Sequence, residues 1–381
     1  MSDSSVTTDP RLDPDFAEAS QWKLVYRRFR KHKVAVLGLY IVVLLYILAL
    51  FAEFFQPFDP NETSVNDVFH PPQKIHWFDT DSVGDRVFRP HVLGQKLTRD
   101  RLTLATHYED DPEEKIFLAL LPEVETYHLA GLIPMSRTLI GPAVSTERFY
   151  LFGADRLGRD MFSRVMAGTR ISMSIGLIGV GLSLFLGMLI GGVAGYLGGW
   201  FDTISTRIIE LIMAMPTIPV WLGLSAAIPQ SLDPMTRYFA ITVILSLIGW
   251  TELARVVRGR FLALRTEDFV IAARLDGARP PRIIFRHMMP SLASHIIASV
   301  SLAIPAMILA ETSLSFLGLG LMPPSISWGV LLKEAQNIRS IAQAPWLFIP
   351  GLFVVLAVLA LNFLGDGLRD AADPYAQDAH S

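Results

Sequence analysis

Long apolar runs without a charged residue recur along the chain, and polar segments separate them. The longest run covers residues 171–200. A helix needs roughly 20 predominantly apolar residues to cross a bilayer, so the pattern predicts six membrane spans. The predicted spans cover residues 34–55, 171–200, 211–228, 238–251, 296–310 with a continuation past Glu311, and 346–365.

Composition supports this pattern. Hydrophobic residues make up 51% of the chain and charged residues 18%, and the mean hydropathy is +0.40, which together lie outside the range of ordinary soluble proteins. The sequence therefore predicts an all-α membrane protein. A net charge of −3 gives no reason to expect a nucleic-acid partner. The absence of Cys excludes disulfides and thiolate metal sites.

Residues 56–150 differ from the rest of the chain. They are rich in Pro, Asp and Asn, and hold 15 acidic residues against 9 basic ones. We interpret them as a soluble insertion between the first two spans. Short mixed segments at 115–121 and 126–133 fit either strands or short helices, since periodicity alone does not separate the two.

Basic residues predict the orientation. The segments on the N-terminal side of the membrane hold sixteen Lys and Arg, whereas the short loops on the opposite side hold three. Cytoplasmic loops carry this excess, so we expect both termini in the cytoplasm and the insertion outside. The basic stretch 23–33 directly precedes the first span, whose apolar length exceeds that of a signal peptide. Residues 34–55 are therefore expected to be a retained transmembrane anchor.

Four glycines within or beside the second span, Gly187, Gly191, Gly195 and Gly199, recur at every fourth position. This spacing leaves one helix face nearly bare and favours close packing against another helix. The alternative is that Gly is simply common in membrane helices.

The segment 252–290 carries eight Arg against four acids and is too basic to span a membrane. The pattern predicts a helix that opens at Glu267, ends near Gly277 and precedes Pro280 and Pro281. A second helical stretch, 282–289, is expected to stop at Pro290. Such a hairpin suits the transfer of a push from a cytoplasmic partner. It also fits a basic loop that only fixes topology.

These residues resemble a known family. The run Ala272-Ala273, then Gly277, then Pro290 is similar to the "EAA" motif of permease subunits in binding-protein-dependent ABC importers. The passages 153–164, 168–172, 311–320 and 323–329 resemble oligopeptide, dipeptide and nickel permeases of the second-permease type. The similarity covers about residues 22–58 and 151–370. Two departures stand out: Ile271 occupies the motif's Glu position, and the insertion is larger than usual.

The resemblance implies a type I ABC importer permease of the bacterial cytoplasmic (inner) membrane. Residues 1–33 and 371–381 are then cytoplasmic segments, and residues 151–370 form a permease core of five spans with an EAA-like coupling loop at 258–290. Implied partners are a second homologous permease, two P-loop ATPase subunits that bind ATP and Mg, an extracytoplasmic solute-binding protein and membrane lipid. The implied ATPase-coupling residues are Ala272, Ala273, Arg274, Asp276, Gly277, Arg279 and Pro290.

The chain itself is not expected to be an enzyme or to hold a cofactor. It has no Gly-Lys pair and hence no phosphate-binding P-loop, and no catalytic motif is recognisable. The histidines lack metal-site spacing, so no metal is expected. Glu311 lies within a span without a nearby base and is a candidate pathway residue, with a structural hydrogen bond as the alternative.

Peptides are the favoured solute. Oligosaccharide or nickel import on the same scaffold remains open, as does an ATPase-independent secondary transporter or assembly factor.

Overall fold

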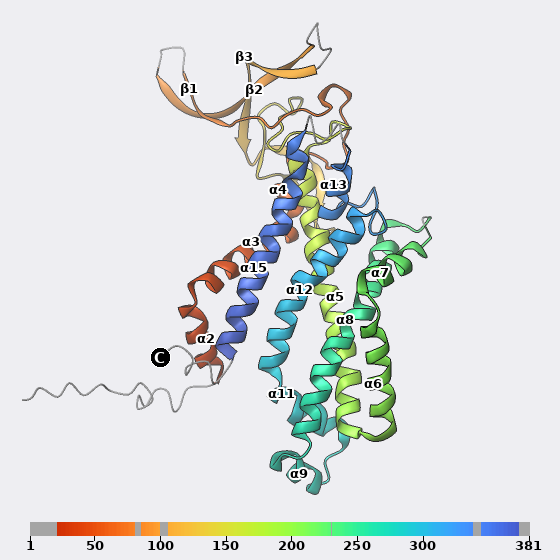
Figure 1. Cartoon of the computed structure of the whole chain (residues 1–381). Helices are drawn as coiled ribbons and strands as arrows, with labels where there is room; N and C mark the ends of the chain where they lie inside the picture. The colour runs from red at the N-terminus through yellow and green to blue at the C-terminus, as the bar shows by residue number, and fades with distance from the viewer. Residues whose placement is uncertain (1–20, 81–84, 100–105, 230, 338–343, 373–381) are drawn as a thin grey trace, which may run out of the picture.

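The computed structural model describes residues 21–80, 85–99, 106–229, 231–337 and 344–372. Most of the expected terminal segments therefore lies outside the described residues. Five of the described helices are long and apolar enough to cross a membrane. They are α3 (Lys33–Leu50), α5 (Met161–Leu197), α8 (Pro234–Leu264), α12 (Ala293–Phe316) and α15 (Ile349–Ala372), and they run along the long axis of the molecule (Figure 1).

Two short helices flank the first span. The basic helix α2 (Gln21–Lys31) precedes α3, and α4 (Ala52–Phe55) follows it. Phe29 of α2 is buried in a small cluster with Ala35 and Ala371, so α2 is packed against the end of α15. The expected basic anchor is thus two helices that meet at His32.

The third expected span, residues 211–228, is bent. It falls on α6 (Gly199–Ala214) and α7 (Thr217–Ala226), which are bent by 89° relative to each other. Met215 and Pro216 between them have extended backbone. A proline disfavours helical geometry in the preceding residue and offers no N–H, so the helix ends there. Counted as one span, the bent pair brings the described total to six.

The insertion is a β structure, which corrects the expectation of an all-α chain. Four antiparallel strands pair in the order β1-β2-β3-β6, and β4 and β5 form a separate hairpin. Both ambiguous segments are strands, in β3 and β4. The strands are β1 (His76–Thr80), β2 (Arg86–Arg99), β3 (Thr106–Leu120), β4 (Glu123–Leu129), β5 (Ile133–Arg137) and β6 (Ile140–Pro142).

Close contact between α5 and α8 organises the helices. A Cβ atom added to Gly187 would lie 2.8 Å from the Leu253 Cβ, and one at Gly195 would lie 2.6 Å from the Phe261 Cβ. At Gly191 it would lie 2.9 Å from the Cα of Ala254. Gly199 is outside this contact, because α5 ends at Leu197 and a Cβ there would meet nothing within 4 Å.

The start of α5 lies before the uncharged run that predicted it. The Asp160 carboxylate accepts hydrogen bonds from the Ser163 backbone N–H at 2.8 Å and from its hydroxyl at 2.6 Å, which caps the helix. Burial raises the pKa of Asp160 to about 6, although the Ser163 hydrogen bonds act in the opposite direction. A charged first turn then extends the helix beyond the apolar span.

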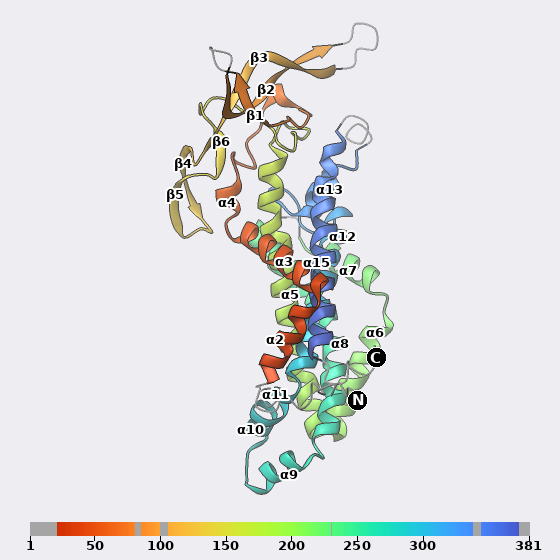
Figure 2. The same cartoon turned by 90° about the vertical axis from the view of Figure 1, so that its left-hand side faces the viewer.

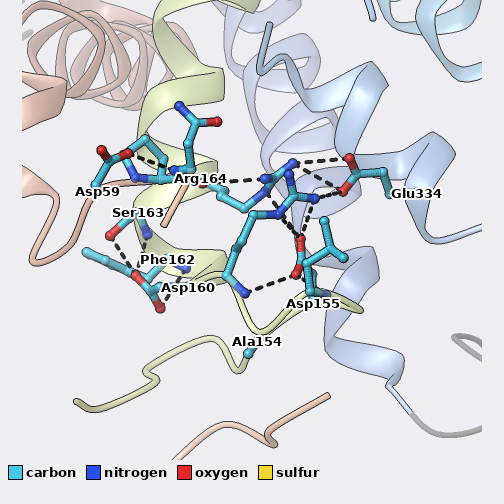
Figure 3. Close-up of polar contacts among 12 residues, drawn as sticks. Asp59, Ala154, Asp155, Asp160, Phe162, Ser163, Arg164 and Glu334 are labelled. Atoms are coloured by element: carbon cyan, nitrogen blue, oxygen red, sulfur yellow. Dashed lines mark hydrogen bonds and ion pairs between the residues drawn. The ribbon is translucent and has the colours of Figure 1, made fainter. Parts of the chain in front are cut away.

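An ion cluster fastens this end of α5 to α13 (Trp328–Glu334), the short helix that follows α12 (Figure 3). The Arg164 guanidinium is 1% exposed and donates to Glu334 at 3.1 Å. Arg159 donates to Glu334 at 2.9 Å and to Asp155 at 2.7 Å. Two cations and two anions therefore neutralise each other. We call this cluster of Asp155, Arg159, Arg164 and Glu334 the latch, and loss of one member would leave a charge buried.

We expect the variant Gly191→Leu to separate α5 from α8, because its side chain has no space beside Ala254. Overpacking of this kind costs about 2 kcal/mol. Thermal unfolding of the purified protein in detergent measures the loss. Gly181→Leu is the matched control, since a Cβ at Gly181 in the same helix meets nothing within 4 Å. Equal melting temperatures for the two variants would contradict the packing argument.

Glu334→Gln should destabilise the protein by about 3 kcal/mol, because it leaves two buried guanidinium groups with one carboxylate. The control is Glu123→Gln in the insertion, whose ion pair with Arg137 is exposed (78% and 56%) and contributes less than about 1 kcal/mol. Denaturant titration of both variants tests the difference, and a similar loss in each would argue against a structural role for the latch.

Candidate coupling surface and buried carboxylate

The predicted cytoplasmic element forms the end of the molecule opposite the β-sheet (Figures 1 and 2). Its first helix is α9 (Asp268–Leu275), which matches the helix predicted from Glu267. Gly277 follows with φ +76°. The backbone N–H of Ala278 bonds the Ala273 carbonyl at 3.0 Å, which closes the helix end in the way that favours glycine.

The second helical stretch forms one continuous run of helix, but its hydrogen-bonding pattern changes along the run. It comprises α10 (Pro280–Arg282), a π-helix at Ile283–Met288 and α11 (Met289–Ser291), and leads through Leu292 into α12. Pro290 therefore lies inside α11 and does not stop the helical path. It occupies the first turn of α11, where a missing backbone N–H is tolerated.

Buried apolar side chains fix α9 to the ends of two spans. Val270 is 0% exposed and Ala273 8% exposed, and both pack with Phe261 of α8 and with Ile283 and Met288 of the π-helix. Ala273 consequently faces its own chain. Of the two implied coupling residues Ala272 and Ala273, only Ala272 is exposed.

The exposed side of α9 carries large apolar side chains in addition to the charged Asp268 and Arg274. Phe269 and Ile271 are each 42% exposed and Leu275 is 82% exposed. Sequence reasoning missed Phe269 and Leu275, although large apolar residues in a basic segment outside the spans were an available signal. We call Phe269, Ile271, Ala272 and Leu275 the α9 face.

The remaining expected coupling residues surround this face. Arg274, Asp276, Gly277 and Arg279 are exposed. The Arg274 guanidinium lies 5.8 Å from the ring centre of Tyr196, near the end of α5. A cation in this position is attracted to the ring, so Arg274 also ties α9 to a third helix.

Glu311 lies on α12 in the interior, with 0% of its surface exposed. Its carboxylate accepts hydrogen bonds from the hydroxyls of Ser315 and Ser327 at 2.8 Å each and from Ser172 at 3.4 Å. These serines come from α12, the residue before α13, and α5. The geometry makes Glu311 a hydrogen-bonded joint between three elements, which favours the structural alternative.

Within the described residues, no group of three or more His, Asp or Glu side chains is arranged to hold a metal ion.

Comparison with known proteins agrees with these features. Residues 183–377 match the family model described as "Binding-protein-dependent transport system inner membrane component". Residues 20–72 match the "N-terminal TM domain of oligopeptide transport permease C".

Individual relatives extend the match to nearly the whole chain. The oligopeptide transport system permease protein OppC of Bacillus subtilis is 30% identical over 93% of this chain and 90% of its own length. The dipeptide transport system permease protein DppC of the same organism is 30% identical over 92% of this chain and 84% of its own length. A putative peptide permease protein of Brucella ovis is 41% identical over 59% of this chain and 73% of its own length.

Among solved structures, an inward-facing MetNI methionine ABC transporter is similar over 55% of this chain and 96% of its own, with 16% identity and a TM-score of 0.43. The family model covers more than half of the 381 residues, and the OppC relative aligns over most of both chains. The chain therefore belongs to the family of inner membrane components of binding-protein-dependent transport systems.

Proposed function

We propose that this chain is one of two permease subunits in an ATP-driven importer of peptides, and that it forms half of the translocation pathway. The two Bacillus subtilis relatives that align along most of its length are an oligopeptide and a dipeptide permease, which supports peptides over oligosaccharides or nickel as solute. The proposal includes six spans in a type I importer fold and a bacterial cytoplasmic membrane with both termini inside.

The observation that carries the proposal is the α9 face. Three large apolar side chains are exposed at the end of the molecule, beyond the spans. Exposed apolar patches of this kind mark protein interaction sites. We assign the face to a cytoplasmic P-loop ATPase subunit, which binds ATP and Mg and performs the hydrolysis.

The packing beneath α9 gives this contact a mechanical consequence. Val270 and Ala273 hold the helix against both the end of α8 and the π-helix that leads into α12. Interiors packed in this way move as units. A displacement of α9 by the ATPase is therefore passed to two spans together, which can switch the pathway between inward-facing and outward-facing states. A secondary transporter or an assembly factor would have no use for this arrangement.

The insertion has a separate assignment. It lies at the end opposite α9, so a cytoplasmic α9 places the sheet outside the cell (Figure 2). We assign it to contact with the solute-binding protein at the outer mouth of the pathway. The adjoining cavity of about 1090 Å³, lined by residues of the insertion and of α5 and α8, has room for a short peptide.

Leu275→Asp should uncouple the importer, because it places a charge in the centre of the proposed contact. We expect import by the purified, reconstituted complex to fall more than about 10-fold, as for loss of an interface hot spot, together with loss of the ATPase subunits from the complex. The chain itself should remain inserted in the membrane.

Leu132→Asp is the matched control for recovery of the ATPase subunits alone, since Leu132 has the same exposed fraction of 82% but lies in the insertion, which we assign to a different partner. Normal import and normal ATPase recovery with Leu275→Asp would contradict the coupling assignment.

A further inference from the structure

Arg237 is a buried cation that has no partner in the described part of the chain. It lies on α8 and is 7% exposed. No carboxylate of the described residues is within 4.0 Å of its guanidinium, and its Nε atom is buried without a hydrogen bond. A buried charge without a counter-charge costs several kcal/mol, and ions in spans commonly mark sites of function.

The other buried charged side chains of the spans do have partners. Arg164 is neutralised by Glu334, and Glu311 accepts hydrogen bonds from serine hydroxyls. Arg237 is therefore the ion whose partner must come from outside the described residues.

Two further donors without acceptors occur on the neighbouring helix. The indole Nε1 of Trp221 and the hydroxyl of Ser225 are buried on α7 and have no hydrogen-bond partner among the described residues. Helices α7 and α8 pack together, and Trp221 joins the apolar cluster of Ile241, which lies one turn beyond Arg237 on the same face of α8. Guanidinium and indole groups only donate hydrogen bonds, so this helix pair offers donors to an anion.

The outer cavity reaches the start of α8, whereas no residue of α7 lines it. Pro234, one turn before Arg237 on α8, lines the cavity, as do the carboxylates of Asp59 and Glu125, which make no ion pair with the described residues. A free peptide carries an ammonium group at one end and a carboxylate at the other. The cavity and Arg237 thus present charges opposite to both.

We propose that Arg237, supported by Trp221 and Ser225, binds the terminal carboxylate of the transported peptide. A planar guanidinium suits a carboxylate because two parallel hydrogen bonds can form. The inference rests on the proposed peptide function and adds to it a group in this chain that recognises the solute. The phosphate of a lipid has related chemistry, and the test separates the two anions.

The experiment compares import of trialanine and of trialanine amide, which lacks the carboxylate, by the complete complex in phosphatidylcholine vesicles. The variants are Arg237→Gln, which removes the charge, and Arg237→Lys, which keeps it. Arg207→Gln is the control, because Arg207 is 78% exposed and pairs locally with Glu210. The affinity of the solute-binding protein for each peptide is measured separately, so that its own preference can be divided out.

We expect Arg237→Gln to lower trialanine import by about 10-fold or more, the loss typical of a charge-assisted hydrogen bond, and to change import of the amide by less than about twofold. Arg237→Lys should retain part of the preference for the free carboxylate, and Arg207→Gln should behave as the wild type.

Four results would overturn the inference. An equal fall for both peptides would make Arg237 a structural residue, and unchanged import would give it no role. A fall that depends on phosphatidylglycerol added to the vesicles, and not on the peptide terminus, would assign the anion to lipid. If the wild-type complex imports neither peptide, the proposed function fails and this inference fails with it.

Discussion

Direct contact between the backbones of α5 and α8 is the constraint on which the rest of the structure depends. Gly187, Gly191 and Gly195 let the helices approach so closely that no side chain fits between them. The two helices run in parallel and reach both ends of the bundle. At one end of the bundle, α5 carries the ion latch to α13 and α8 carries Arg237. At the other end, α8 supports α9 through Phe261. The glycine contact thus links the two ends of the bundle.

Charged side chains within the spans differ in how many ion-pair and hydrogen-bond partners they have among the described residues. This difference distinguishes residues that hold the structure together from residues that are candidates for binding a ligand. Glu311 and Arg164 are fully buried, yet each has partners from elements distant in sequence. Their role is to hold those elements together. The Nε atom of Arg237 is buried without an acceptor among the described residues, and a buried donor of this kind costs free energy. Burial alone makes an ion a candidate site, whereas its hydrogen-bond partners show whether a ligand is needed.

Hydropathy was sufficient to locate the long apolar helices, because a bilayer requires long apolar runs whatever the tertiary structure. It could not place their ends. Asp160 extends α5 into a charged region through its cap, and Pro216 bends the third span, although both signals were visible in the sequence. The strands of the insertion were ambiguous, since segments such as 115–121 are too short for periodicity to decide between strand and helix.

The position of helix α9 and of the turn that follows it was predicted from the sequence. The helix end at Gly277 follows from local chemistry, because glycine readily adopts positive φ. The burial of Ala273 and the exposure of Leu275 depend on packing against the π-helix, which no local pattern indicates. The same limit applies to Arg237, because its lack of a counter-charge among the described residues is a property of the folded chain. It applies also to Gly199, which the four-residue spacing wrongly placed in the contact between α5 and α8.

The central claim is that the α9 face seats on an ATPase subunit. The most direct measurement places a photo-crosslinking amino acid at position 275 in the chain expressed with its neighbouring genes, irradiates intact membranes and identifies the adduct by mass spectrometry. The account predicts an adduct with a P-loop ATPase subunit. An adduct formed only with lipid, or with proteins that lack a P-loop, would contradict it.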